Sequence, residues 1–535
     1  MFLAMRLSGY SILISILLGW YGVGFKLPVI GHRHPSAHQS DPLETETIFL
    51  KFNERNTAPS RCEFACTYLS KTYADTVAFP GSDKYSQFQA SFWSQQQSKT
   101  QPMCIFRPKN VSQVSFAMFV ITQVNCTFAV RSGGHATFPG ASNIQDGMAF
   151  DMRSINDIII APDRKTAILG TGNTWYDVYK ALEVHNLIAV GARAGDVGVG
   201  GHILGGGISF LSNLYGWACG NVINYEVVGA YGGILNIDAQ RPEMFFALCG
   251  GGNNFGIVTR FTVNIYPQGP MWQGLREFSM DHKQAVLDTY VNLGRAIIKD
   301  LRSSNGFIAF TVTQEAERIR AHLENADGIP YPPIFAEMEA IPTVFESSKV
   351  QYMSEITKAL ANETPPGSRY THWTYTFKLD AWLVRFVADT FLATINPLRA
   401  IRGIVVECNF QTVTEPMLSQ MKGNAFGLSV EGGPYTLHLL SAAWSNEADD
   451  ETIYRTFSNM IQTIKEEANE SGVHTDYLFM NYASQFQDVI SSYGADNVQR
   501  LRVASYNDDP EGFLRELQPG YFKLNGSAPA ELRKG

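Results

Sequence analysis

Basic charge is in short supply in this 535-residue chain. Lys and Arg number 42 against 50 Asp and Glu, which gives a net charge of −8. Nucleic acids and anionic membrane surfaces favour basic partners, so the balance argues against both. Charged residues make up 17% and hydrophobic residues 45%, a composition that is ordinary for a globular protein and excludes disorder. The length is sufficient for two domains, each with its own core.

Several signatures of familiar sites are also missing from the sequence. Neither a G-x-G-x-x-G that opens a helix nor the P-loop pattern G-x-x-x-x-G-K-[ST] occurs, which disfavours a Rossmann or P-loop nucleotide site. H-E-x-x-H, C-x-x-C and G-x-S-x-G are absent as well, which weakens zinc protease and serine hydrolase interpretations. No internal repeat and no low-complexity tract is present.

The N-terminus has the pattern of a secretory leader. Its first six residues carry one positive charge, and none follows from Leu7 to Phe25. We predict a cleaved signal peptide over residues 1–25 and a secreted or secretory-lumen protein. A signal anchor is the alternative, because the apolar run is long enough to span a bilayer and lacks a clean A-x-A cleavage site. Three glycines in the run weaken a helix and favour cleavage: Gly19, Gly22 and Gly24.

Export makes disulfides and glycosylation possible. The chain has seven cysteines, so at least one thiol stays unpaired. Four of them would enter the lumen first: Cys62, Cys66, Cys104 and Cys126. The sequons are compatible with glycosylation but arise easily by chance in a chain rich in Asn, Ser and Thr: Asn110, Asn125, Asn362, Asn469 and Asn525.

Changes in composition and in hydrophobic pattern divide the chain into segments. Residues 26–60 resemble a linker, and ordered structure is expected from near Cys62. From there to about residue 270, glycine clusters alternate with short strand candidates, namely Cys126–Val130, Ala167–Leu169 and Val222–Gly229. Between 271 and 474 glycines thin out and longer helices alternate with strands such as Gly306–Thr313 and Ile404–Val413.

A helix is expected directly after Asp449. Apolar residues recur there at helical spacing, acidic residues stand at the positive N-terminal end, and Gly472 ends the segment. The apolar positions are Ile453, Phe457, Ile461 and Ile464.

Three glycine clusters carry the strongest functional signal: RSGGH (131–135), GVGGHILGGG (198–207) and GGGNNFG (250–256). Paired glycines let successive N–H groups point inward and form an anion-binding nest. A single cluster of this kind is more simply explained as a tight turn than as a ligand-binding nest. Three within one region favour a large phosphate-bearing ligand.

Two histidines lie within these clusters. His135 ends the first cluster, where its imidazole would lie beside the ligand, and a neutral imidazole is a competent nucleophile. His202 lies inside the second cluster. Both could instead be loop residues whose hydrogen bonds are met within the protein, or metal ligands.

These motifs, with RPEMFFALCGGGNNFGIVTRF (241–261) and YLFMNYA (477–483), resemble the berberine bridge enzyme-like, PCMH-type FAD-linked oxidoreductases, in particular the fungal branch. The resemblance runs in family order from Cys66 to Lys523. It implies an α+β fold in which residues 61–270, completed by 475–535, form a PCMH-type FAD-binding domain of two subdomains. Residues 271–474 would form a substrate domain, an antiparallel sheet flanked by helices. It also implies a Cys66–Cys104 disulfide.

The resemblance further implies FAD bonded covalently through its 8α-methyl carbon to His135. The first glycine cluster would wrap the pyrophosphate, His202 would tune the flavin, Ile257 and Val258 would line the adenine side, and Tyr482 would face the substrate. The implied cofactor-binding set is Arg131, Ser132, Gly133, Gly134, His135, Val197, Gly200, Gly201, His202, Gly206, Gly207, Ile257, Val258, Asn481 and Tyr482.

Two departures from the family pattern, and one position that agrees with plant relatives, shape the prediction. Ala194 stands where bicovalent members have a second, cysteinyl flavin tether, so a single histidyl bond is expected. Thr137 replaces a plant active-site tyrosine, so plant substrate contacts do not carry over. Val197 stands where a small residue favours access of oxygen to the flavin, which implies an oxidase that forms hydrogen peroxide.

The implied reaction is hydride transfer from a small organic substrate, in a secondary-metabolite pathway, to flavin, followed by reoxidation by O2. Tyr482 and His202 are the candidate catalytic residues, and Tyr482 is the first candidate base if a neighbouring cation or donor activates it. A structural role for Tyr482 is the alternative. Glu415 and His438 lie in the second domain but cannot be placed in a pocket from the sequence.

The rival functions are an extracellular carbohydrate oxidase and a non-catalytic flavin-binding scaffold, while the substrate and the oligomeric state are left open.

Overall fold

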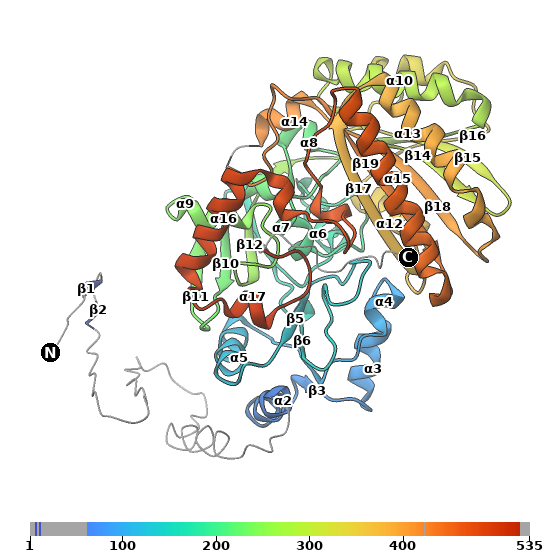
Figure 1. Ribbon diagram of the computed structural model, residues 1–535. Coiled ribbons are helices and arrows are strands. Elements are labelled where there is room, and N and C mark those ends of the chain that lie inside the picture. Colours follow the sequence, from blue (N-terminus) through green and yellow to red (C-terminus); the bar gives the residue numbers. More distant parts are fainter. Residues whose placement is uncertain (1–5, 8–9, 12–60, 422, 525–535) are drawn as a thin grey trace. The chain divides into compact units, whose positions relative to one another are not determined.

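A computed structural model describes residues 6–7, 10–11, 61–421 and 423–524 (Figure 1). The short strands β1 (Arg6–Leu7) and β2 (Tyr10–Ser11) pair antiparallel in a unit that is separate from residues 59–535. The rest of the predicted leader and linker lies outside the described residues. Within the described ranges, no helix combines the length and apolar character needed to cross a bilayer.

The first sheet is small and mostly parallel. Its strand order is β3-β4-β6-β5, and β6 runs parallel to both of its neighbours. Its strands are β3 (Val77–Ala78), β4 (Cys104–Phe106), β5 (Phe128–Arg131) and β6 (Met148–Asp151). Its helices are α2 (Arg61–Thr72), α3 (Asp83–Ala90), α4 (Gln95–Ser98) and α5 (Val111–Val124). Strand β5 begins at Phe128 and not at Cys126, because the Cys126 N–H still donates to Ile121 O at the end of α5.

Two disulfides join α2 to the elements beside it. Cys66–Cys104 confirms the bridge that the resemblance implied, and Cys62 pairs with Cys126. A third bridge, Cys219–Cys249, lies in the next part of the chain. Cys408 is buried and free, which accounts for the odd cysteine count.

The second sheet is antiparallel along the order β11-β10-β12-β8-β7, with β9 also on β12. Its strands are β7 (Ile158–Ile160), β8 (Thr166–Gly170), β9 (Leu187–Ala189), β10 (Val222–Val228), β11 (Ile234–Ile237) and β12 (Ile257–Pro267). Four helices belong to this region: α6 (Trp175–Glu183), α7 (Val199–Leu204), α8 (Ser212–Tyr215) and α9 (Pro242–Leu248). The predicted strands at 167–169 and 222–229 are confirmed as β8 and β10.

The third sheet has seven antiparallel strands in the order β16-β13-β15-β14-β18-β19-β17. They are β13 (Met271–Phe278), β14 (Ser303–Thr313), β15 (Glu317–Asn325), β16 (Phe345–Gln351), β17 (Arg369–Lys378), β18 (Val405–Val413) and β19 (Tyr435–Trp444). Strand β14 begins at Ser303, before the predicted Gly306, which lies at a register shift between Asn305 and Phe307.

Helices cover one face of this sheet, as Figure 1 shows for α10, α13 and α15. The helices of this region are α10 (Lys283–Ala296), α11 (Ala336–Glu339), α12 (Met353–Glu363), α13 (Ala381–Thr394), α14 (Glu415–Gln420) and α15 (Asp450–Glu470). The helix predicted after Asp449 is confirmed as α15: Ile453, Phe457 and Ile464 are buried. The opposite sheet face is left for the site described below.

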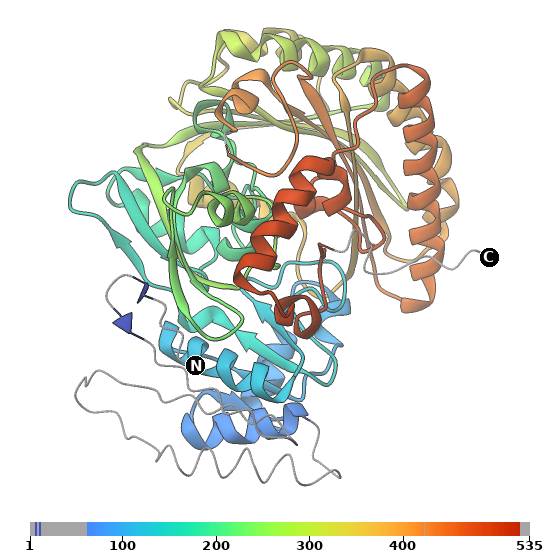
Figure 2. The same ribbon diagram turned by 60° about the vertical axis from the view of Figure 1, so that its left-hand side comes forward.

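The last part of the chain returns to the second sheet. It forms α16 (Ala495–Asp508) and α17 (Phe513–Leu517), and α16 packs against α9 (Figure 2). The Tyr493 hydroxyl donates to Gly250 O at 3.0 Å, and Asn254 Nδ2 donates to Phe522 O at 2.9 Å. The α+β class is confirmed, while the exact domain boundaries stay a prediction.

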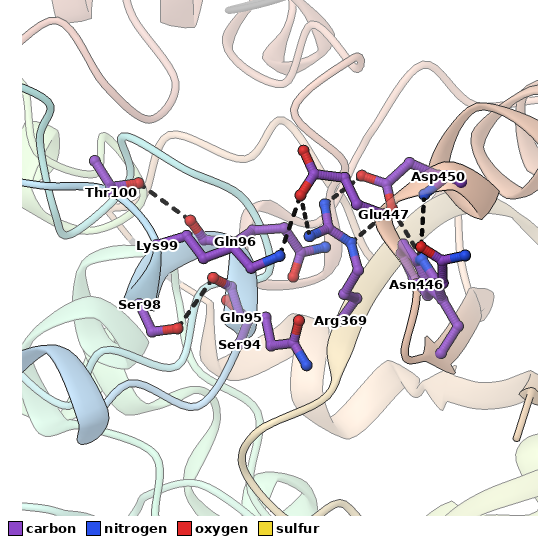
Figure 3. Close-up of polar contacts among 12 residues, drawn as sticks. Ser94, Gln95, Gln96, Ser98, Lys99, Thr100, Arg369, Asn446, Glu447 and Asp450 are labelled. Atoms are coloured by element: carbon purple, nitrogen blue, oxygen red, sulfur yellow. Dashed lines mark hydrogen bonds and ion pairs between the residues drawn. The ribbon is translucent and has the colours of Figure 1, made fainter.

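A polar contact joins the α4 segment to the third sheet (Figure 3). Lys99 Nζ lies 3.1 Å from Glu447 Oε2, and beside this pair Arg369 of β17 donates through Nε to Asp450 Oδ1 of α15 at 2.6 Å. Backbone bonds run beside these charges, because Gln95 N donates to Ser368 O at 2.9 Å. These contacts fix the third sheet against the first part of the chain.

Candidate active site

A cavity of about 600 Å³ lies between the glycine clusters and the free face of the third sheet. The first and second clusters, residues 252–258 and the segment around Tyr482 all contribute to its wall. Of the predicted cofactor-binding residues, the following line the cavity: Ser132, Gly133, Gly134, His135, Val197, Gly200, Gly201, His202, Ile257, Val258, Asn481 and Tyr482. The fold thus brings together residues that are far apart in the sequence.

Three predicted residues lie outside the lining. The buried Arg131 side chain turns away and donates to Ser91 O at 2.6 Å and to Phe88 O at 3.1 Å. A β carbon on Gly206 would meet Trp217, and one on Gly207 would meet the ring of His202. The side chain of Arg131 and these two glycines therefore serve packing around the cavity.

The first glycine cluster touches the start of the second cluster backbone to backbone. A β carbon on Gly133 would lie 2.7 Å from Gly198 Cα, and one on Gly198 would lie 2.6 Å from Gly133 Cα. Ser132 also joins the two clusters, because its hydroxyl accepts from Gly200 N at 3.1 Å, and it donates to Thr171 O at 2.6 Å. Only glycine at positions 133 and 198 permits the two backbones to come this close.

His135 lines the cavity, and an aromatic ring and a carboxylate both lie against its imidazole. Its ring stacks on Trp93, with centroids 4.1 Å apart, and Trp93 stacks on Tyr370 in turn at 3.7 Å. The Nε2 atom lies 3.3 Å from Asp196 Oδ2. Asp196 itself is not part of the cavity lining.

His202 is buried in α7 beneath the cavity. Burial lowers its pKa to about 3, so the imidazole is neutral at ordinary pH. Asn481 Nδ2 donates to the His202 carbonyl at 3.0 Å, which brings the C-terminal segment onto this helix. A β carbon on Gly205 would collide with the Asn481 amide, so the glycine makes room for that contact.

Strand alternation builds the opposite wall. Phe310, Cys408 and Leu440 are register neighbours on β14, β18 and β19, and they are buried in the core on the helix-covered face. The next row on the same strands, Thr311, Glu407 and Ser441, lines the cavity instead. Side chains alternate between the two faces of a strand, so one register supplies both core and site.

Tyr482 lies at one end of this wall with its hydroxyl held by two side chains. The Arg193 guanidinium donates to the Tyr482 oxygen, and Gln411 Nε2 donates to it at 3.2 Å. Arg193 also donates to Gln411 Oε1 and to the carbonyl of Gly306. The Tyr482 hydroxyl in turn donates to Gln411 Oε1 at 3.4 Å. Arg193 therefore supplies the cation that the sequence analysis required but did not locate.

His372 of β17 is a second residue that sequence reasoning missed. Its ring centroid lies 5.8 Å from that of Trp93 and 6.4 Å from that of Tyr482, so it stands between the two ends of the cavity. Burial lowers its pKa to about 3, with the neighbouring His135 adding to the effect. No sequence signal identified His372, because it stands in an ordinary alternating strand.

The far part of the wall is acidic. The Glu407 carboxylate accepts from Thr311 at 3.0 Å and from Ser441 at 3.4 Å. Glu363 lies 3.2 Å from Arg320, and burial raises its pKa. Two residues that the sequence left unplaced, Glu415 and His438, are not part of the lining. Among the described residues, no group of three His, Cys, Asp or Glu is arranged to hold a metal.

Comparisons with known proteins agree with this geometry. Residues 102–238 match the family described as FAD binding domain. The chain is 33% identical over 458 residues to the FAD-dependent monooxygenase FUP4 of Fusarium proliferatum, covering 81% of this chain and 87% of that protein. The chain belongs to the berberine bridge enzyme-like, PCMH-type family of FAD-linked oxidoreductases.

Solved structures share the fold. The BBE-like 1 protein of Physcomitrella patens aligns with a TM-score of 0.68 and 19% identity, over 88% of this chain and 98% of that one. The glucooligosaccharide oxidase of Acremonium strictum, described with a 6-S-cysteinyl, 8α-N1-histidyl FAD, aligns with a TM-score of 0.68 and 16% identity, over 88% and 100% of the two chains.

The residues present fit FAD. Gly201 lines the cavity and a β carbon there would meet no atom within 4 Å, so backbone faces open space at this point, which suits a close-bound pyrophosphate. Ile257, Val258 and Tyr521 supply apolar lining beyond it, while His135 and Tyr482 stand toward the third sheet. The protein is thus an FAD-dependent oxidoreductase.

Proposed function

We propose that this protein is an oxidase whose FAD is bonded to His135 and which removes a hydride from a small organic substrate, with O2 as the final electron acceptor. The observation that carries the proposal is the Tyr482 hydroxyl, held by Arg193 and Gln411 in the same cavity that His135 borders. A scaffold that merely stores flavin would need no polarised oxygen there. When bound, FAD supplies the hydride acceptor.

The chain's own residues have separable parts in this reaction. Tyr482 acts as a phenolate stabilised by the Arg193 guanidinium, and it accepts the proton of the attacked alcohol or amine to become the neutral phenol. His372, kept neutral by burial, lines the substrate side without adding charge. Val197 lines the cavity with a small side chain, which leaves room for oxygen.

The single tether is proposed at Nδ1 of His135. Asp196 faces Nε2, and no hydrogen bond to another described residue occupies Nδ1, which leaves that nitrogen free to form the bond. Ala194 lines the cavity at the position of the family's cysteinyl tether and offers no thiol. The glucooligosaccharide oxidase described above carries both tethers, so a carbohydrate oxidase with bicovalent flavin is the less favoured alternative.

We also propose that the protein works in the secretory lumen or outside the cell. Three disulfides support an oxidising compartment, since cytosolic proteins rarely keep them. Cleavage of the leader and glycosylation stay predictions.

Acid precipitation tests the tether directly. Wild-type protein should keep yellow colour and flavin fluorescence in the pellet and on a denaturing gel, whereas His135→Ala should release its flavin. Flavin lost from both proteins would remove the covalent bond and leave a noncovalent flavoenzyme. Well-folded protein without any flavin would contradict the oxidase as a whole.

Labelled oxygen separates an oxidase from a monooxygenase, the activity named for the Fusarium relative. An oxidase should release one hydrogen peroxide for each substrate oxidised and leave no atom of ¹⁸O₂ in the product. Incorporation of ¹⁸O without matching peroxide would assign the protein to the monooxygenases instead.

A further inference from the structure

We propose that Asp196 is the positioning residue that prepares His135 for its bond to the flavin. The inference rests on the proposed covalent tether and adds a residue to it. Asp196 comes two residues after Ala194, the position at which the second tether is missing.

The contact between the two side chains is well isolated. His135 Nε2 and Asp196 Oδ2 lie 3.3 Å apart, and the side chains are 18% and 36% exposed. Nε2 and the other carboxylate oxygen, Oδ1, are both buried and make no hydrogen bond to any residue in the described ranges. No lysine or arginine of those ranges pairs with Asp196. Its carboxylate therefore acts on the imidazole without a competing cation.

The backbone holds Asp196 in place. Gly195 N donates to Thr357 O at 2.9 Å, and Tyr176 N donates to Gly195 O at 2.8 Å. On the other side, the Gly133–Gly198 contact presses the segment against the turn that carries His135. Trp93 holds the plane of the imidazole by stacking, and the Asp196 carboxylate, 3.3 Å from Nε2, favours the ring rotation that turns this nitrogen toward it.

That orientation selects the reactive form of histidine. A carboxylate beside Nε2 favours the tautomer with its proton on Nε2, which leaves the lone pair on Nδ1. The same arrangement recurs wherever a histidine must present one nitrogen to a partner and its other nitrogen faces a carboxylate.

The attachment step balances with Asp196 as proton acceptor. One bond forms, between Nδ1 and the 8α-methyl carbon, while one C–H bond of that methyl group and the N–H bond at Nε2 break. Bound FAD would supply the acceptor for the two electrons, and O2 would remove them together with the C–H and N–H protons as hydrogen peroxide. Asp196 accepts the Nε2 proton, and its partial exposure lets that proton pass to solvent.

The test follows the rate of attachment, not turnover. Apoprotein from a riboflavin-starved host is mixed with FAD, and flavin retained after acid is measured against time. We expect Asp196→Asn to bind FAD, seen by quenching of flavin fluorescence, but to attach it about 100-fold more slowly than wild type. Asp75→Asn, which removes an exposed carboxylate far from the cavity, should attach flavin at the wild-type rate.

Chemical rescue distinguishes proton acceptance from a structural role. Added formate should accelerate attachment in Asp196→Ala, because a small carboxylate can enter the partly exposed gap. Wild-type rates in Asp196→Asn, or no rescue in an Asp196→Ala protein that binds FAD, would overturn the inference alone. Wild-type protein that never retains flavin after acid would instead overturn the tether.

Discussion

At the residue scale, the reaction depends on the Tyr482 oxygen and the charge beside it. Arg193 reaches that oxygen from the segment that also carries Asp196, so one short stretch of chain serves both Tyr482 and His135. The RSGGH and MNY motifs indicated His135 and Tyr482 from the sequence. Arg193 and Asp196 carry no motif of their own, because their roles depend on which segments the fold places beside them.

Removing the Tyr482 hydroxyl should slow flavin reduction without loss of flavin. We expect Tyr482→Phe to reduce the anaerobic reduction rate, measured by stopped flow with a substrate found by peroxide release, at least about 100-fold. Tyr477→Phe is the matched control, because its buried hydroxyl has no hydrogen-bond partner among the described residues. Equal rates in the two variants would assign Tyr482 a packing role.

At the scale of elements, two ion pairs beside the third sheet differ in burial: one joins β17 to α15, and the other joins the α4 segment to the residues before α15. Arg369 is 4% exposed and binds Asp450, which also accepts from Trp444 Nε1 at 2.9 Å. Lys99 and Glu447 lie nearby with side chains 55% and 67% exposed (Figure 3). Water screens the second pair far more than the first.

Arg369→Ala should therefore destabilise the protein, while Lys99→Ala should not. Losing Arg369 leaves the Asp450 carboxylate without its cation, and we expect a cost of about 2–3 kcal/mol in the free energy of unfolding. Lys99→Ala should leave that free energy unchanged within error. Urea denaturation of the two variants measures both, and equal losses would contradict the distinction by burial.

For the whole molecule, buried histidines tie stability to pH. Burial lowers the pKa of His202 and His322 to about 3 and that of His438 to about 4. Below pH 6.5 the unfolded chain binds protons at these histidines, and the native protein does not until its own lower pKa values are reached. Falling pH therefore favours unfolding.

We expect the urea midpoint to fall steadily from pH 6.5 to 4.5. Each buried histidine contributes up to about 1.4 kcal/mol per pH unit across that window. His322→Gln should flatten the slope by removing one of these groups. A midpoint independent of pH between 6.5 and 4.5 would show that the histidines protonate within the folded protein.

The sequence by itself determined the strands and the helix with clear periodicity, because such patterns are local. Its resemblance to a known family implied the α+β class and the Cys66–Cys104 bridge, and the structure confirms both. Element ends were less well predicted, because Cys126 still completes a helix and Gly306 lies at a bulge.

Only the tertiary structure decided which side chains meet. Arg193 reaches Tyr482 across 289 positions of sequence, and Asp196 reaches His135 through a contact between two glycine backbones. It likewise placed Thr311, Glu407 and Ser441 on the cavity side of one sheet, and turned the Arg131 side chain away from it. Such contacts depend on how distant segments pack, and no periodicity within a single segment encodes them.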